Sequence, residues 1–108
     1  MNDFVDQILA RSRTARIIVL GDINDFEFSE TVEILEGGVL TTLVRTLAPE
    51  ERYSYVFEGN SQVLDQILGS NRGMLRLKPQ YDVVHVNSEF ADAVQASDHE
   101  PAIMQFTP

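Results

Sequence analysis

The chain contains no cysteine, which excludes disulfide bonds and thiolate metal sites. It is also poor in positive charge, because 17 acidic residues stand against 8 basic ones, for a net charge of −9. This balance argues against broad, sequence-independent binding of nucleic acid, which needs a basic surface. It does not exclude an enzyme that meets phosphate through a divalent cation, because carboxylates hold such cations.

Long apolar runs are missing as well, since none approaches the roughly 20 residues that span a bilayer. The first residues, Met1-Asn2-Asp3-Phe4, lack the basic flank and apolar stretch of a secretory signal. No membrane partner is expected, and the compartment is left open because the parent of a partial chain can still be secreted. The 108 residues, 44% of them hydrophobic, suffice for one folded domain over residues 1–108.

Three helices are predicted. The first covers residues 2–12 and is capped by Asn2; its apolar stripe consists of Phe4, Val5, Ile8 and Leu9. The second covers residues 30–36, where Ser29 caps the start and Gly37-Gly38 ends the helix. The third is a short helix over residues 40–47 that Pro49 closes.

The remaining segments predict strands. The apolar run 17–20 indicates a central strand covered on both faces, and it stops at a polar cluster. Further strands are expected at residues 53–57, 63–68, 81–86 and 102–106, with an exposed connection over 69–80. The order of elements predicts an α/β domain with a mixed, mostly antiparallel sheet and flanking helices.

Two short segments carry candidate chemistry. In the first, Gly21-Asp22-Ile23-Asn24, a glycine permits a tight turn after the strand, and a carboxylate beside an amide suits phosphoryl transfer. In the second, Ser97-Asp98-His99 offers a carboxylate for a cation and an imidazole for acid–base work. Asp65, on the strand at 63–68, is a natural partner to fix the tautomer of His99.

Simpler interpretations stand beside these. Asp-x-Asn is a common turn, a Ser-Asp-His loop is no more specific, and Asp65 can simply satisfy a loop backbone. His85 alternates with strand residues and is interpreted as structural. The acidic stretch 22–30 lacks the glycine and spacing of a calcium loop. The basic group Arg72, Arg76 and Lys78 is interpreted as a solvated connection.

Three motifs, in this order, carry a resemblance. The run 17–25 is similar to an apolar strand followed by Gly-Asp-x-Asn, and Tyr53-Ser54-Tyr55 with the run 63–68 to an aromatic strand and a Leu-Asp-x-Ile-Leu strand. The segment 97–101 is similar to a closing Ser-Asp-His-x-Pro. Together they resemble the endonuclease/exonuclease/phosphatase superfamily, which includes pancreatic-type deoxyribonucleases, abasic-site endonucleases, inositol-phosphate phosphatases and sphingomyelinases. Within this superfamily, residues 21–29 and 53–68 are most similar to bacterial extracellular nuclease-like members.

The resemblance implies a role for each matched residue. Asp22 would orient or activate the attacking water, and Asn24 would hydrogen-bond the scissile phosphate. His99 would stabilise that phosphate and would be held by Asp65. Asp98 would help to hold a divalent ion, Mg²⁺ or Mn²⁺.

The resemblance also implies an incomplete site. The family domain is more than twice this length, and its first half supplies an asparagine and a glutamate that ligate the metal. No residue here can be assigned to that glutamate, whereas Gln66 and Glu100 are minor departures within the motifs. The expected fold is the C-terminal half of a four-layer α/β sandwich, inactive in isolation and with no metal necessarily bound.

Three functions are therefore weighed. The first is a fragment of a metal-dependent phosphodiesterase, foremost a nuclease, for which nucleic acid is a partner of the complete domain. The second is a non-catalytic dimeric module, and the third is part of a phosphatase acting on a small phosphorylated lipid or sugar. Half a sandwich exposes a sheet face, and burial stabilises by roughly 25 cal/mol per Å² of apolar surface, so a symmetric homodimer packed sheet to sheet is expected.

Overall fold

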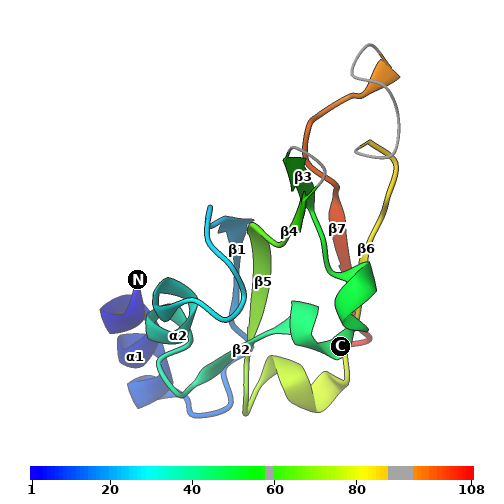
Figure 1. Cartoon of the computed structure of the whole chain (residues 1–108). Coiled ribbons are helices and arrows are strands. Elements are labelled where there is room, and N and C mark those ends of the chain that lie inside the picture. Colours follow the sequence, from blue (N-terminus) through cyan, green and yellow to red (C-terminus); the bar gives the residue numbers. More distant parts are fainter. Residues whose placement is uncertain (58–59, 88–93) are drawn as a thin grey trace.

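The computed structural model describes residues 1–57, 60–87 and 94–108. In this part of the chain, two α-helices, three 3₁₀ helices and seven strands follow one another (Figure 1). The helices are α1 (Asn2–Arg11) and α2 (Glu30–Glu36), and the 3₁₀ helices are Leu43–Thr46, Pro49–Glu51 and Met74–Leu77. The strands are β1 (Ile18–Asp22), β2 (Leu40–Thr42), β3 (Tyr55–Phe57), β4 (Asn60–Gln62), β5 (Asp65–Ser70), β6 (Gln80–Val83) and β7 (Ala102–Gln105).

Helix α1 confirms the first predicted helix but differs at its start and on its apolar face. Met1 occupies the cap position, and Asn2 is the first helical residue, whose amide donates a hydrogen bond to the Ile34 carbonyl of α2. Val5 is buried, whereas Phe4 is 63% exposed. Because successive helical residues are turned by about 100°, Phe4 lies beside the contact stripe and not on it. Asn2 thus joins the two helices and does not cap α1.

Helix α2 forms as predicted, because both of its ends are specified locally. The Ser29 hydroxyl accepts a hydrogen bond from the Val32 amide at 3.2 Å, which satisfies one of the free amides of the first turn. Gly37 ends the helix in the left-handed region at φ 55°, where glycine carries no steric penalty. Val32 is fully buried and anchors the helix on the sheet.

The main sheet has the strand order β1-β5-β2, and both pairings are antiparallel. Its central strand is β5, in which residues 66–70 are all buried. In the described part of the chain, β1 lies at the edge, and Leu20 is 67% exposed. The prediction of a central strand at residues 17–20 is therefore wrong. The apolar run reflects the packing of Ile18 and Val19 on opposite faces, and strand order depends on distant pairings that a local run does not encode.

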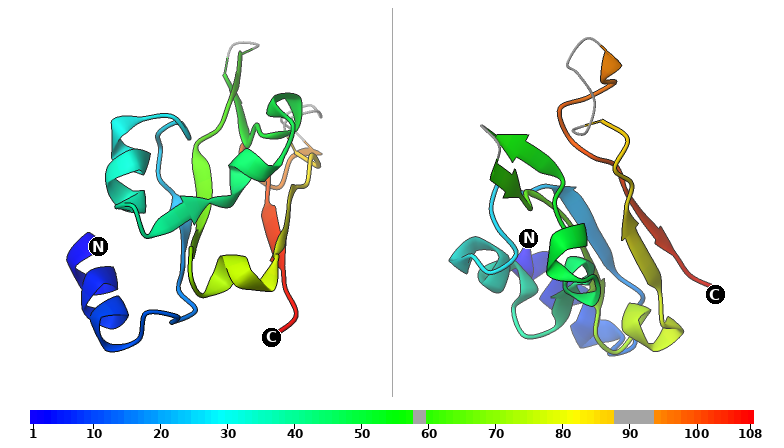
Figure 2. Two further views of the ribbon diagram at one scale, coloured as in Figure 1. Left: turned by 90° about the horizontal axis from the view of Figure 1, so that it is seen from below. Right: turned by 45° about the vertical axis from the view of Figure 1, so that its right-hand side comes forward.

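The two faces of this sheet are covered by different elements, and Figure 2 shows helices on one side and the β6–β7 pair on the other. On the helical side, Val5 of α1 packs with Leu40 and Leu68. On the opposite side, Ile67 packs with Tyr81 and Val83 of β6. The result is a small domain of helices and antiparallel sheets in three layers, with β5 at its centre.

Two further strand pairs, β3–β4 and β6–β7, are also antiparallel. The strands predicted at 53–57, 81–86 and 102–106 are confirmed, with shorter bounds. Every strand pair in residues 1–57, 60–87 and 94–108 is antiparallel, so the mixed sheet that we predicted is not found there. Antiparallel pairing needs no long crossover, which suits the short connections of this chain.

Two other predicted segments are corrected. The helix expected at 40–47 begins instead as β2, because the β-branched residues Thr41 and Thr42 pair with β5 before a 3₁₀ turn follows. The exposed connection expected at 69–80 is partly internal, since β5 continues to Ser70 and Met74 is 1% exposed. Among the described residues, no helix has the length and apolarity that crossing a membrane requires.

Candidate functional site

Asp22 and Asp65 are direct partners across two neighbouring strands. The register of β1 and β5 sets Leu20 opposite Ile67 and Asp22 opposite Asp65. Since side chains alternate along a strand, both carboxylates lie on the face toward the β6–β7 pair. Two like charges that oppose each other directly destabilise a sheet. This pair therefore favours a cation beside it.

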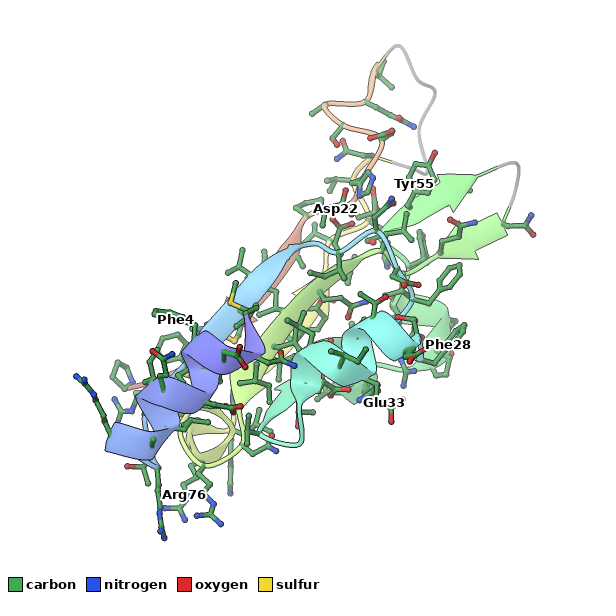
Figure 3. The ribbon with its side chains drawn as sticks, turned by 90° about the vertical axis from the view of Figure 1, so that its left-hand side faces the viewer. Phe4, Asp22, Phe28, Glu33, Tyr55 and Arg76 are labelled. Carbon is green, nitrogen blue, oxygen red and sulfur yellow. The ribbon has the colours of Figure 1, made fainter. Side chains whose placement is uncertain are left out.

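His99, in the segment that leads into β7, lies beside the two carboxylates and can carry the positive charge. Its Nδ1–H donates to Asp65 Oδ2 at 2.6 Å, and its Nε2 lies 3.9 Å from Asp22 Oδ2. The backbone of His99 forms a bridge with Tyr55, and the two rings lie 5.0 Å apart. Asp22 and Tyr55 lie near each other at one end of the molecule (Figure 3). Asp22, Asp65 and His99 are therefore close to one another, and we call them the Asp22–Asp65–His99 cluster.

The protonation of His99 depends on two opposing effects. Partial burial alone would lower the pKa of His99, but its hydrogen bond to Asp65 and the negative charges of Asp65, Asp22 and Asp98 together outweigh burial. The net effect raises the pKa of His99 above its ordinary value of 6.5. The imidazole therefore favours the cationic form, which can donate from Nε2 to an anion.

The turn that follows β1 is fastened to β5. The amides of Ile23 and Asn24 both donate to the Leu64 carbonyl, at 3.0 and 3.1 Å. The Asn24 amide also reaches Asp22 Oδ1 at 2.9 Å, and Asn24 has a φ of 55°. This is the Asx turn that we weighed as the simpler interpretation. The same turn fixes one oxygen of Asp22 and leaves the other toward His99, while the side chain of Asn24 is exposed.

A metal at this cluster is tested by its donor set. One ligand atom each from Asp22, Asp65 and His99 lies within 4.8 Å of the others. His99 Nδ1 and Asp65 Oδ2 already share a hydrogen bond, so Nε2 is the only ring nitrogen left to ligate, and it can do so only when the imidazole is neutral. Mg²⁺ also prefers a shell of oxygen ligands. The three residues as arranged do not fit a metal cage.

Asp98, the predicted metal ligand, lies beside this cluster. Its side chain is exposed, and its charge contributes to the raised pKa of His99. It is not one of the residues whose ligand atoms group together in the described part of the chain. Asp98 therefore acts on His99 through its field in this structure, and no contact joins it to Asp22 or Asp65.

Ser54 holds the site together, and the sequence-based reasoning did not single it out. Its hydroxyl accepts from the amides of Leu64 and Asp65, at 3.1 and 3.2 Å. Its carbonyl accepts from the Glu100 amide at 2.7 Å, and the side chain is 1% exposed. One buried serine thus fixes the backbones of both Asp65 and the residue after His99. The only local signal was a small polar residue between two aromatic ones.

Glu100, which we interpreted as a minor departure from the Ser-Asp-His-x-Pro motif, is a buried residue with several polar contacts. It is 3% exposed, and its carboxylate accepts from the Asn87 amide at 2.7 Å and lies 3.2 Å from His85 Nδ1. His85 also stacks on Tyr53, with ring centroids 3.9 Å apart. These contacts agree with the structural interpretation of His85, although β6 ends at Val83 before reaching it.

The structure thus brings together three of the five predicted site residues, while Asn24 and Asp98 lie at its exposed rim. Comparison with family models found no match, and neither curated proteins nor solved structures gave one. The geometry of the Asp22–Asp65–His99 cluster is therefore the basis on which a function is proposed.

Proposed function

We propose that the Asp22–Asp65–His99 cluster is part of a phosphodiester-hydrolysing site, foremost that of a nuclease. The observation that carries this proposal is the position of His99 between two carboxylates, at 2.6 Å from Asp65 and 3.9 Å from Asp22. A histidine that is oriented by one carboxylate and faces a second is an arrangement suited to acid–base chemistry. The resemblance of the sequence motifs to the endonuclease/exonuclease/phosphatase superfamily, which includes the same three residues, agrees with this proposal.

In the proposed mechanism, each residue has one task. Cationic His99 donates from Nε2 to a non-bridging oxygen of the phosphate, where negative charge increases in the transition state. Asp65 keeps the proton on Nδ1 and so fixes the orientation of the ring. Asp22 accepts the proton of the attacking water as the water oxygen bonds to phosphorus, and the side-chain amide of Asn24 donates to a second phosphate oxygen. The P–O bond to the leaving group breaks, and the leaving oxygen takes a proton from solvent.

The proposal extends to the fold and the metal. The chain would be the C-terminal half of a four-layer sandwich, and the residues that complete the site would come from outside it. Asp98 would help to hold Mg²⁺ or Mn²⁺ together with ligands from outside the chain. The Asp22–Asp65–His99 cluster alone does not supply a complete set of metal ligands. Without the remaining ligands, we expect the isolated chain to bind a phosphodiester but not to hydrolyse it.

The test has a binding arm and a turnover arm. A simple diester such as diethyl phosphate should shift the nuclear magnetic resonance signals of the His99 ring and raise its pKa further, because the ligand is an anion. Asp22→Ala, which removes a neighbouring negative charge, should keep this response, and the exposed Asp82→Ala serves as the matched control. Plasmid nicking and diester hydrolysis with Mg²⁺ or Mn²⁺ should not exceed the rates of Asp22→Ala and His99→Ala.

Two outcomes would count against this proposal. If diethyl phosphate left the His99 signals unchanged at all accessible concentrations, the cluster would not be a phosphate site. If the chain hydrolysed diesters and lost that activity in both Asp22→Ala and His99→Ala, the site would be complete, and the claim of a missing half would be wrong.

A further inference from the structure

Six of the eight basic residues lie in two segments that the fold brings together at one end of the molecule. Of the 8 basic residues, Arg45 and Arg52 form ion pairs with Glu36 and Glu27. The other six lie in two segments, at residues 11–16 and 72–78: Arg11, Arg13, Arg16, Arg72, Arg76 and Lys78. No acidic residue occurs in residues 7–21 or 66–81. In Figure 3, Arg76 marks this basic end, opposite the end that carries Asp22.

The fold fastens these two segments to each other. The Ser70 hydroxyl donates to the Ala15 carbonyl at 2.7 Å and accepts from the amides of Ile17 and Met74, both at 3.1 Å. Ser70 is 1% exposed. Next to it, a Cβ on Gly73 would lie 2.1 Å from the Ala15 oxygen. The loop after α1 and the turn after β5 are therefore held in close contact.

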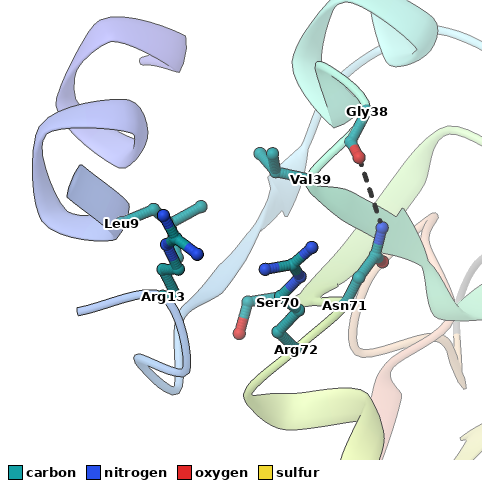
Figure 4. Close-up of a pocket in the computed structure, with 7 residues that line it drawn as sticks. All are labelled: Leu9, Arg13, Gly38, Val39, Ser70, Asn71 and Arg72. Carbon is teal, nitrogen blue, oxygen red and sulfur yellow. Dashed lines mark hydrogen bonds between the residues drawn. The ribbon is translucent and has the colours of Figure 1, made fainter.

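A cavity of about 300 Å³ opens between these segments. Figure 4 shows the guanidinium groups of Arg13 and Arg72 on its two sides. Neither arginine has an ion-pair partner among the described residues. Two unpaired cations that share a cavity repel each other, and an anion between them removes that repulsion.

The remaining lining gives the cavity a polar and an apolar part. The backbone amide of Asn71 donates a hydrogen bond to the Val39 carbonyl at 2.9 Å. The Thr41 hydroxyl donates to the side-chain oxygen of Asn71 at 2.6 Å, and the two hydrogen bonds orient Asn71. Leu9 and Val39 contribute apolar surface on the helical side. A fitting ligand therefore carries an anionic group for the arginines and a compact apolar group.

We propose that this cavity binds a small phosphate monoester, with its dianionic phosphate between Arg13 and Arg72 and its organic group against Leu9 and Val39. Guanidinium groups match the geometry of phosphate oxygens and bind them in pairs of hydrogen bonds. The second ionisation of a phosphate monoester lies near pH 6, and arginine stays charged throughout. Binding should therefore weaken as the pH falls below about 6.

The test uses the whole chain with phenyl phosphate and with inorganic phosphate. We expect calorimetric titration to detect both and phenyl phosphate to bind more tightly. Arg13→Gln and Arg72→Gln should each weaken phenyl phosphate at least about tenfold, the usual loss for a charge-assisted contact. Arg76→Gln removes the same charge from the basic end outside the cavity, and it should change the affinity by less than about twofold.

Several results would overturn the proposal. Equal losses in Arg76→Gln and Arg72→Gln would mean diffuse attraction by the basic end. Loss of binding in His99→Ala would place the ligand in the Asp22–Asp65–His99 cluster. Tighter binding of an oligonucleotide, weakened alike by Arg13→Gln, Arg72→Gln and Arg76→Gln, would indicate an extended polyanion surface. No detectable binding of either phosphate at tens of millimolar would remove the site altogether.

Discussion

At the scale of single residues, the position of His99 is explained by the charges around it. Asp22 and Asp65 oppose each other across β1 and β5, and His99 lies against both. Because the folded-state pKa of His99 is raised, protonation stabilises the fold. This contribution is fully present below the unfolded pKa near 6.5 and is lost as the pH rises through the folded pKa.

Asp65→Asn tests this coupling. We expect the pKa of His99 to fall in the variant, because the hydrogen bond and the charge of Asp65 are the two largest effects that raise it. Nuclear magnetic resonance titration of the His99 ring measures the pKa directly. Thermal unfolding at pH 5.5 and pH 8.5 should show a loss of stability in the variant at the lower pH and little loss at the higher.

Asp82→Asn is the matched control, because Asp82 is an exposed aspartate on β6. It should leave the pKa of His99 within about 0.2 units, since exposed and distant charges are screened by solvent and salt. An unchanged His99 pKa in Asp65→Asn would mean that the 2.6 Å contact does not hold the proton in solution.

The candidate residues were singled out in the sequence by their chemistry in two short segments, and the resemblance to a family then gave each of them a role. Asp22 and Asp65 are 43 positions apart in the chain, and only the β1–β5 register makes them neighbours. Ser54 and Glu100 left almost no local signal, because a buried polar side chain is recognised by its partners. Those partners, the amides of Leu64, Asp65 and Asn87, are set by tertiary structure.

At the scale of elements, the sequence predicted those whose ends are specified by nearby residues, and it did not predict features that depend on long-range contacts. Helix α2 could be predicted because Ser29 and Gly37 define its ends within the segment itself. The edge position of β1 could not, since it depends on β5 pairing with β2 on its other side. Likewise, Gly73 and Met74 at the start of the 74–77 turn are buried because the backbone of Gly73 lies close to Ala15, which is far away in the sequence.

Gly73→Ala tests how tightly that turn is packed. The new Cβ would meet the Ala15 carbonyl at 2.1 Å, so the loop after α1 or the turn after β5 must move. We expect a loss of about 3 kcal/mol or more in the free energy of unfolding, as for severe overpacking. Chemical denaturation monitored by circular dichroism measures it.

Gly69→Ala is a graded comparison for this substitution. Its Cβ would lie 3.1 Å from Met74 Cβ and 3.5 Å from Leu75 Cδ2, which is tight but does not overlap with a backbone atom as in Gly73→Ala. The loss should therefore be smaller than in Gly73→Ala. Equal stability of wild type and Gly73→Ala would show that the contact between the two segments is looser than in the structure.

At the scale of the whole molecule, apolar side chains remain at the surface of the sheets. Leu20 on the edge strand β1 is 67% exposed, and Ile103 on β7 is 54% exposed. Exposed apolar groups on strands with free edges favour association. The exposed Leu20 on the edge strand β1 is the observation that supports the proposal that two copies associate as a symmetric dimer.

Light scattering after gel filtration tests the dimer. We expect a dimer at micromolar concentration and a monomer in Leu20→Lys, because a charge in the interface would be buried without a partner. Ile34→Lys, which alters an exposed residue of α2, should leave the dimer intact. A wild-type chain that is strictly monomeric at micromolar concentration would exclude the association.

The separation of charge along the β1–β5 ribbon makes the protein an electric dipole. The two ends of β1, Ile18 on the side of the basic segments and Asp22 at the acidic cluster, are separated by about 13 Å, at about 3.3 Å per residue. A net charge of −9 repels an anion at long range, yet the dipole turns the basic end toward it on approach. Encounters with anions should therefore be oriented before any contact forms, and salt should weaken both the repulsion and the orientation.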